Sequence, residues 1–220
     1  MKLCMIGTGY VGLVSGVCFA DLGNEVICVD KDNNKINNLK KGIIPIYEPG
    51  LEELVLKNYR NKRLSFSSDL KTSVRNSDIV FICVGTPTKK NGIGAGKASD
   101  LKWIEASARH VARCAKGTTI VVEKSTLPVK TALTIKRILE SQQNNNPKSF
   151  PQSFAVLSNP EFMSEGNAIK DLENPNRVLI GGEDKIAIEV LAEIYSNWVP
   201  NKKIIRIIFV KDKIINYLIK

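Results

Sequence analysis

The run Gly7-Thr8-Gly9-Tyr10-Val11-Gly12 has residue types and a spacing that suit the binding of phosphate groups. It follows an apolar run at residues 2–6 and precedes a helical pattern at residues 11–22. Gly9 has no Cβ, so the backbone there is able to approach a pyrophosphate, and the first N–H groups of the helix would face the same anion. The pattern therefore predicts a dinucleotide-binding βαβ unit.

Asp30 closes the second apolar run, 23 positions after Gly7 and near the offset of about 20 residues expected for a carboxylate that accepts ribose hydroxyls. Lys31 places a cation beside it, but the carboxylate itself would repel a 2′-phosphate. We therefore expect NAD, rather than NADP, as the cofactor.

Composition favours a soluble globular protein, with 43% hydrophobic and 25% charged residues in a chain of 220. We find no apolar run of the roughly 18 residues that cross a membrane, no secretory signal and no metal site. The five cysteines form no C-x-x-C pair, so we expect buried free thiols in a reducing compartment. These features predict a cytoplasmic protein without a membrane partner.

The net charge of +10 raises the question of nucleic-acid binding, which depends on how that charge is distributed. Residues 201–220 hold six Lys or Arg against one Asp, which is half of the excess. The rest is spread out without the aromatic interleaving that a stacking surface needs. We therefore expect a solvated basic surface and no nucleic-acid partner.

Short β-branched runs alternate with helical patterns along the chain, which predicts an α/β fold: a Rossmann-like, doubly wound, mostly parallel sheet with helices on both faces. Strands are expected at residues 2–6, 25–30, 64–67, 79–84, 118–123, 154–158 and 177–180. Helices are expected at residues 11–22, 31–41, 51–58, 69–76 and 185–198, from the cap Asp100 to residue 115, and after Pro128. The polar segment 141–152 predicts an exposed connection, and residues 201–220 fit no single period.

Ligands of doubly wound sheets lie at the carboxyl ends of the strands, so the residues expected there are informative. Three of these ends lead into Val84-Gly85-Thr86-Pro87-Thr88, Glu123-Lys124-Ser125-Thr126 and Asn159-Pro160-Glu161-Phe162. Small and hydroxyl residues in the last two loops are suited to contact a ribose or nicotinamide.

Glu161 and Glu165 are four residues apart, so on one helical turn their carboxylates would face the same way. Such a pair suits a general base and a water-orienting group. An interpretation of equal weight is that Glu161 caps the helix that follows.

Six motifs occur in an order that resembles the UDP-glucose 6-dehydrogenases of the UDP-glucose/GDP-mannose dehydrogenase family. Besides the glycine run they are Pro45-Ile46-Tyr47-Glu48-Pro49-Gly50-Leu51, Val84-Gly85-Thr86-Pro87-Thr88, Glu123-Lys124-Ser125-Thr126-Leu127-Pro128-Val129, Ser158-Asn159-Pro160-Glu161-Phe162-Met163-Ser164-Glu165-Gly166 and Asn174-Pro175-Asn176-Arg177-Val178-Leu179-Ile180-Gly181-Gly182. The resemblance covers about residues 1–200, and the loop at residues 89–100 resembles the animal and plant members most.

The resemblance implies an NAD-dependent oxidoreductase that oxidises UDP-glucose twice to UDP-glucuronate, through a thioester on a cysteine. It implies NAD contacts from Gly7, Thr8, Gly9, Tyr10, Val11, Gly12, Asp30, Lys35, Val84, Gly85, Thr86, Pro87, Thr88, Ser125, Thr126, Leu127 and Glu165. It implies that Thr126 and Glu161 are catalytic, with Glu161 as the base that helps water attack the thioester. It implies UDP-glucose contacts from Glu161, Phe162, Met163, Ser164 and Glu165.

The resemblance fades after residue 200, where the family continues into a central helix, the catalytic cysteine segment and a UDP-binding domain. We expect residues 1–200 to form an NAD-binding domain and residues 201–220 to form a divergent basic, isoleucine-rich tail. Our hypothesis for the origin of this tail is intron read-through or a frameshift in the gene model. The chain alone is then expected to bind NAD weakly, to turn over UDP-glucose undetectably, and to expose an apolar surface that favours association. Full-length members are expected to be homo-oligomers.

Three other interpretations remain open from the residues. The first is a dehydrogenase of another sugar nucleotide such as GDP-mannose, or of β-hydroxy acids. The second is a non-catalytic NAD-binding fragment that associates with full-length subunits. The third and weakest is nucleic-acid binding through the basic tail.

Overall fold

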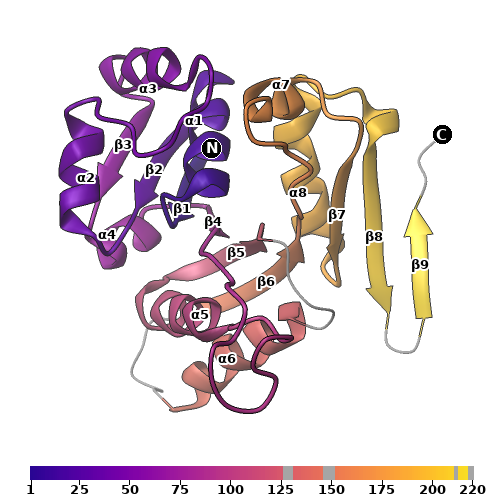
Figure 1. Ribbon diagram of the computed structural model, residues 1–220. Coiled ribbons are helices and arrows are strands. Elements are labelled where there is room, and N and C mark those ends of the chain that lie inside the picture. Colours follow the sequence, from indigo (N-terminus) through magenta and orange to yellow (C-terminus); the bar gives the residue numbers. More distant parts are fainter. Residues whose placement is uncertain (126–130, 146–151, 211–212, 218–220) are drawn as a thin grey trace.

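Residues 1–125, 131–145, 152–210 and 213–217 are described by a computed structural model (Figure 1). In this part of the chain nine strands form one sheet in the order β3-β2-β1-β4-β5-β6-β7-β8-β9. Strands β1 to β6 are parallel to one another, whereas β7 runs antiparallel to β6 and β9 antiparallel to β8. The predicted α/β, doubly wound, mostly parallel sheet is therefore confirmed.

The strands expected from the sequence all form, with ends that shift by no more than two residues. They are β1 (Lys2–Ile6), β2 (Glu25–Val29), β3 (Leu64–Ser67), β4 (Ile79–Ile82), β5 (Gly117–Glu123), β6 (Gln152–Ser158) and β7 (Val178–Gly182). Strand β4 is buried along its whole length between β1 and β5, as its uninterrupted apolar run indicates.

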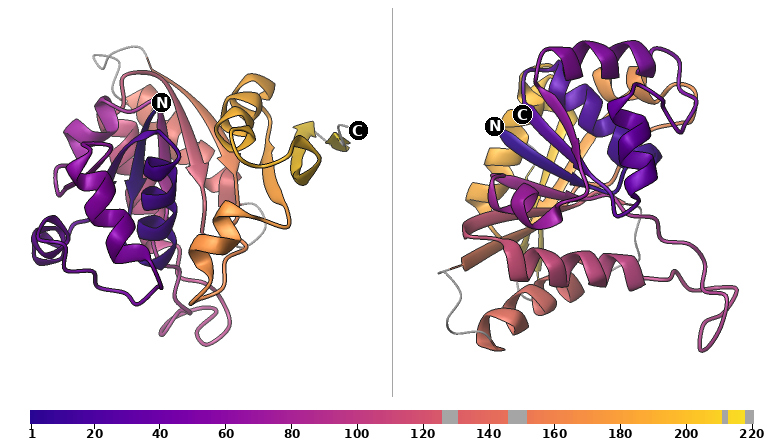
Figure 2. Two further views of the ribbon diagram at one scale, coloured as in Figure 1. Left: turned by 90° about the horizontal axis from the view of Figure 1, so that it is seen from above. Right: turned by 90° about the vertical axis from the view of Figure 1, so that its left-hand side faces the viewer.

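Helices cover both faces of the sheet, which Figure 2 shows from two sides. One face buries apolar side chains of α1 (Tyr10–Asp21), α2 (Asn33–Lys40), α3 (Leu51–Arg60), α7 (Ala168–Glu173) and α8 (Lys185–Ser196). The other buries those of α4 (Leu70–Arg75), α5 (Lys102–Cys114) and α6 (Thr131–Asn145). Among the helices of the described residues, none has the length and apolar character needed to cross a membrane.

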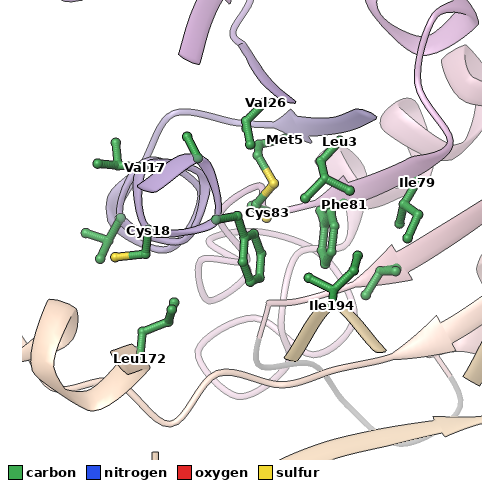
Figure 3. Packing of buried hydrophobic residues seen from close by; sticks show 14 of the residues in the cluster. Leu3, Met5, Val17, Cys18, Val26, Ile79, Phe81, Cys83, Leu172 and Ile194 are labelled. Atoms are coloured by element: carbon green, nitrogen blue, oxygen red, sulfur yellow. The ribbon is translucent and has the colours of Figure 1, made fainter. Parts of the chain in front are cut away.

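The larger core cluster joins the sheet to α1, α7 and α8. Figure 3 shows side chains that meet there from β1, β4, α1, α7 and α8, among them Met5, Phe81, Cys18, Leu172 and Ile194. Four cysteines are buried free thiols, as expected, and Cys114 is partly exposed. This core holds the carboxyl ends of β1 and β4 in fixed relation to α1.

Two segments differ from expectation. The polar residues 141–145 continue α6 rather than forming a connection, because α6 packs on α5 and β6 through apolar side chains such as Ile135 and Leu139, and tertiary packing outweighs local polarity. The described residues of the tail have regular structure. After a 3₁₀ turn (Asn201–Lys203), β8 (Ile204–Val210) pairs with β7 and β9 (Lys213–Tyr217) pairs with β8. Interstrand pairing places these residues in the sheet although their apolar pattern is irregular.

Candidate active site

The glycine run forms a tight turn between β1 and α1. Gly7 adopts a φ of +101°, and its N–H donates to the Val29 carbonyl at 2.8 Å. A Cβ on Gly12 would lie 1.9 Å from the Gly7 carbonyl oxygen, so only glycine fits there. A Cβ on Gly9 would meet no atom within 4 Å among the described residues, which leaves open space in front of the first turn of α1. The N–H groups of that turn are therefore available to an anion.

Asp30 follows β2 directly and ties this turn to the neighbouring strand. Its Oδ2 accepts the Thr8 N–H at 3.0 Å and the Thr8 hydroxyl at 2.7 Å, and lies 3.3 Å from Lys35 Nζ. Its Oδ1 accepts the Asp32 N–H at 3.2 Å. Burial alone would raise the pKa of Asp30, but the hydrogen bonds from Thr8 and Asp32 and the charge of Lys35 outweigh it and hold the pKa below its usual value. The carboxylate is therefore ionised at neutral pH.

A cavity of about 570 Å³ opens beside this turn. It lies at the carboxyl ends of β1, β2 and β4, where the order of the strands reverses between β1 and β4. Six residues predicted from the sequence to contact NAD line it: Gly7, Gly9, Asp30, Lys35, Val84 and Gly85. Its size and its place at the topological switch point suit a nucleotide.

One wall of this cavity was not predicted from the sequence. Trp103, Ala106, Ser107 and His110 line it from α5 at positions i, i+3, i+4 and i+7, so they share one helical face. The Lys31 Nζ lies 3.4 Å from the centroid of the Trp103 ring. The same spacing in the sequence is the signal that would have revealed this wall. Its indole and imidazole rings provide flat surfaces for a planar ligand.

The other residues predicted to contact NAD have different surroundings. Thr8 is buried against Asp30, Val11 and Gly12 pack into the core side of α1, and the Tyr10 hydroxyl bonds Glu48. The Ser125 hydroxyl donates to the Val84 carbonyl at 2.9 Å.

The remaining predicted contacts lie further from the cavity wall or outside the described part of the chain. Thr86, Pro87 and Thr88 lead into the long loop that ends at residue 100 (Figure 2). Thr88 pairs with Ser99, and the Asp100 N–H donates to the Pro87 carbonyl, so these contacts close the base of the loop. Glu165 is exposed on the loop after β6. Thr126 and Leu127 lie outside the described residues.

A second, smaller hollow lies beside the loop after β6 and is lined by Glu161, Phe162, Met163 and Arg177 among others. The Arg177 guanidinium lies 4.4 Å from the centroid of the Phe162 ring. Ser164 donates through its N–H and its hydroxyl to Asp171, at 2.8 and 2.6 Å, which fixes the turn before α7.

Lys124 also lines this hollow, and the sequence pattern assigned it no individual role. Its side chain is 3% exposed, and its Nζ donates to Asn159 Oδ1 and to the Tyr195 hydroxyl, each at 3.1 Å. The Tyr195 hydroxyl in turn donates to Asn159 Oδ1 at 2.7 Å. Burial raises the pKa of Cys83 to about 12, an effect that the charge of Lys124 opposes and that of Glu161 reinforces. Both charges therefore act at the carboxyl end of β4.

The carboxylates of Glu161 and Glu165 do not share a helical turn, so that expectation is wrong. Residues 159–164 have no helical structure, and α7 begins at Ala168 after the N-cap residue Asn167. The alternative, in which Glu161 caps the helix, is wrong for the same reason. Asn159 explains this backbone path, because its Nδ2 donates to the Leu179 carbonyl at 2.8 Å and holds the chain in an extended exit from β6.

Glu123 is a buried carboxyl at the end of β5. Its side chain accepts the Ser158 hydroxyl at 3.1 Å, and the residue is 7% exposed. Burial raises the pKa of Glu123 to about 7; the hydrogen bond from Ser158 opposes the rise and the charge of Glu161 adds to it. A carboxyl that titrates near neutrality therefore lies close to Glu161.

Comparison with known families places this geometry in context. Residues 1–199 match the family model described as UDP-glucose/GDP-mannose dehydrogenase family, NAD binding domain. The UDP-glucose 6-dehydrogenase of Rhizobium meliloti (strain 1021) is 52% identical over 197 residues, which are 89% of this chain and 43% of the relative. UDP-glucose 6-dehydrogenase 1 of Arabidopsis thaliana is 48% identical over 211 residues, 93% of this chain and 42% of the relative. The chain thus spans about two fifths of the length of these relatives.

Solved structures with the same fold include a ternary complex of GDP-mannose dehydrogenase from Pseudomonas aeruginosa. It has a TM-score of 0.83 and 37% identity, over 94% of this chain and 46% of that one. A UDP-glucose dehydrogenase from Pyrobaculum islandicum has a TM-score of 0.80 and 36% identity, over 90% of this chain and 44% of that one.

Proposed function

Since the chain belongs to the UDP-glucose/GDP-mannose dehydrogenase family and carries its NAD-binding domain, we propose that it provides the coenzyme half of an NAD-dependent UDP-glucose 6-dehydrogenase. The observation that carries the proposal is the pair Asp30 and Thr8, which joins the glycine turn to β2 beside the 570 Å³ cavity. We propose residues 1–200 as the NAD-binding domain, with β8 and β9 continuing its sheet.

The residues of this cavity fit NAD. The glycine turn presents the N–H groups of α1 to the pyrophosphate, with open space in front of Gly9. Asp30 is ionised and would accept the hydroxyls of the adenine ribose, whereas a 2′-phosphate at the same place would be repelled. Lys31 does not offset this repulsion, because its Nζ lies over the Trp103 ring. Trp103 and His110 would flank the adenine, and Val84, Gly85 and Ser125 would lie toward the nicotinamide end.

Bound NAD would supply the hydride acceptor for oxidation of the sugar carbon. The residues of this chain position the reactants at the ends of β4, β5 and β6. Phe162, Met163 and Ser164 contact the sugar nucleotide, and Glu161, Glu165 and Thr126 complete the site. The Glu161 carboxylate accepts a proton from the water that hydrolyses the thioester, and the sulfur of the enzyme's catalytic cysteine is the leaving group. Lys124 lines the same hollow as Glu161.

Ligand-dependent thermal stabilisation tests this proposal, because a ligand that binds the folded state raises the melting temperature according to its affinity. The chain is melted with NAD, NADP, UDP-glucose and GDP-mannose at equal concentrations. We expect NAD to stabilise it more than NADP, and UDP-glucose more than GDP-mannose when NAD is present. Equal stabilisation by NADP and NAD would contradict the coenzyme assignment, and preference for GDP-mannose would assign the chain to the second sugar nucleotide of the family.

A further inference from the structure

Glu48 is a nearly buried carboxylate that none of the steps above uses. It is 6% exposed, and it lies in the loop between α2 and α3. Its Oε2 accepts the Tyr10 hydroxyl and the Gly166 N–H, the latter at 2.8 Å, and its Oε1 accepts the Ile169 N–H at 3.4 Å. Three donors from two distant parts of the chain thus converge on one carboxylate.

Tyr10 connects this carboxylate to the glycine turn. It is the first residue of α1, directly after Gly9, and its hydroxyl also accepts the Gly166 N–H at 3.0 Å. Burial and the hydrogen bond to Glu48 raise the pKa of Tyr10 to about 12, so the phenol remains a donor at neutral pH. The first turn of α1 and residue 166 are therefore joined by side-chain hydrogen bonds across 156 positions of sequence.

The segment held in this way carries the proposed base and the proposed sugar-nucleotide contacts. Residues 164–167 are exposed, and Gly166 has a φ of +86°, so local burial contributes little to the conformation of this turn. The hydrogen bonds from Ser164 to Asp171 fix one side of the turn, and those from Gly166 and Ile169 to Glu48 fix the other.

We propose that Glu48 is a positioning residue that couples coenzyme binding to the order of the sugar-nucleotide loop, residues 161–169, through Tyr10. The coupling rests on the proposed function, because it needs a coenzyme on the first turn of α1. Coenzyme contact fixes that turn, the Tyr10 hydroxyl then holds Glu48 in place, and Glu48 holds Gly166 and Ile169. Binding of either ligand thereby orders part of the site in advance, so binding of the other costs the chain less conformational entropy.

Backbone amide hydrogen exchange in the coenzyme-free chain measures directly whether Glu48 holds the amides of Gly166 and Ile169. Glu48→Gln and Tyr10→Phe are compared with matched controls, Glu53→Gln at an exposed position of α3 and Tyr47→Phe at a tyrosine that is 86% exposed. We expect exchange at Gly166 and Ile169 to rise about tenfold in Glu48→Gln and less in Tyr10→Phe. The controls and the amides of β1 and β4 should match wild type, which excludes a general loss of stability.

The same measurement with NAD tests the coupling. In wild type NAD should slow exchange at Gly166 and Ile169, and in Tyr10→Phe this slowing should fall below half although calorimetry still detects bound NAD. If NAD slows amide exchange equally in wild type and Tyr10→Phe, the coupling is overturned. If exchange at Gly166 and Ile169 is unchanged in coenzyme-free Glu48→Gln, the positioning role of Glu48 is overturned. Absence of NAD binding to wild type would instead refute the proposed function, which separates the two failures.

Discussion

Thr8 donates both its backbone N–H and its hydroxyl to a single oxygen of Asp30, at 3.0 and 2.7 Å. This pair links the turn after β1 to the end of β2, and Asp30 also lines the cavity. Its Oδ1 accepts the Asp32 N–H at 3.2 Å. One carboxylate therefore shapes the phosphate-binding turn and faces the space for the ribose.

The two glycines of the turn should respond differently to a methyl group. Gly12→Ala places a Cβ 1.9 Å from the Gly7 carbonyl oxygen, so we expect it to lower the free energy of unfolding by about 1–3 kcal/mol. Gly9→Ala meets no described atom within 4 Å, so it should leave unfolding nearly unchanged and weaken NAD binding at least about tenfold by filling the space for the pyrophosphate. Urea unfolding and calorimetric titration measure both effects. Equal loss of stability in the two variants would contradict this account.

Trp103 should report coenzyme binding by its fluorescence. It lines the cavity, whereas the second tryptophan, Trp198, is partly buried against the core with its ring centroid 5.3 Å from that of Tyr195. We expect NAD to quench the emission of Trp198→Phe, in which Trp103 is the remaining indole, and to leave that of Trp103→Leu nearly unchanged. Loss of the flat indole surface should also weaken NAD binding about fivefold. Quenching that persists in Trp103→Leu would remove this side chain from the site.

Glu123 should make folding stability depend on pH near neutrality. Its pKa is raised to about 7 in the folded chain from an unfolded value of 4.5, so the folded state binds more protons between these two values. Stability should therefore fall as pH rises through this window, by about 1–3 kcal/mol in all. Glu123→Gln should flatten this dependence, and Glu193→Gln, at an exposed position of α8, should not. Urea unfolding at pH 5 and pH 8 measures the difference, and parallel pH profiles of wild type and Glu123→Gln would refute the prediction.

The sheet and the coenzyme turn were predictable because their signals are local. Glycines at 7, 9 and 12 and the acid after β2 occupy positions fixed by backbone geometry, and the structure places Gly7, Gly9 and Asp30 on one cavity. The wall formed by α5 was predictable in principle, because its lining residues recur at a helical period in the sequence.

Other features depend on contacts between distant segments, which one sequence does not display. Glu48 meets Gly166 across 118 positions, and Lys124 meets Tyr195 across 71. The extended backbone at Glu161 depends on the hydrogen bond from Asn159 to the Leu179 carbonyl. The spacing of Glu161 and Glu165 alone therefore predicted a helical turn wrongly. Pairing with β7 likewise set the structure of β8, whose irregular apolar pattern gave no strand period.

Calorimetric titration of the chain with NAD tests the central claim, that the glycine turn and Asp30 together bind the coenzyme. Asp30→Ala is compared with wild type and with Glu25→Ala, an exposed acid at the opposite end of β2, after thermal melting confirms that each variant is folded. Loss of a charged hydrogen-bond acceptor predicts NAD binding weaker by about 1.5–3 kcal/mol, roughly tenfold to a hundredfold, for Asp30→Ala and unchanged binding for Glu25→Ala. Equal dissociation constants for wild type and a folded Asp30→Ala would contradict the claim.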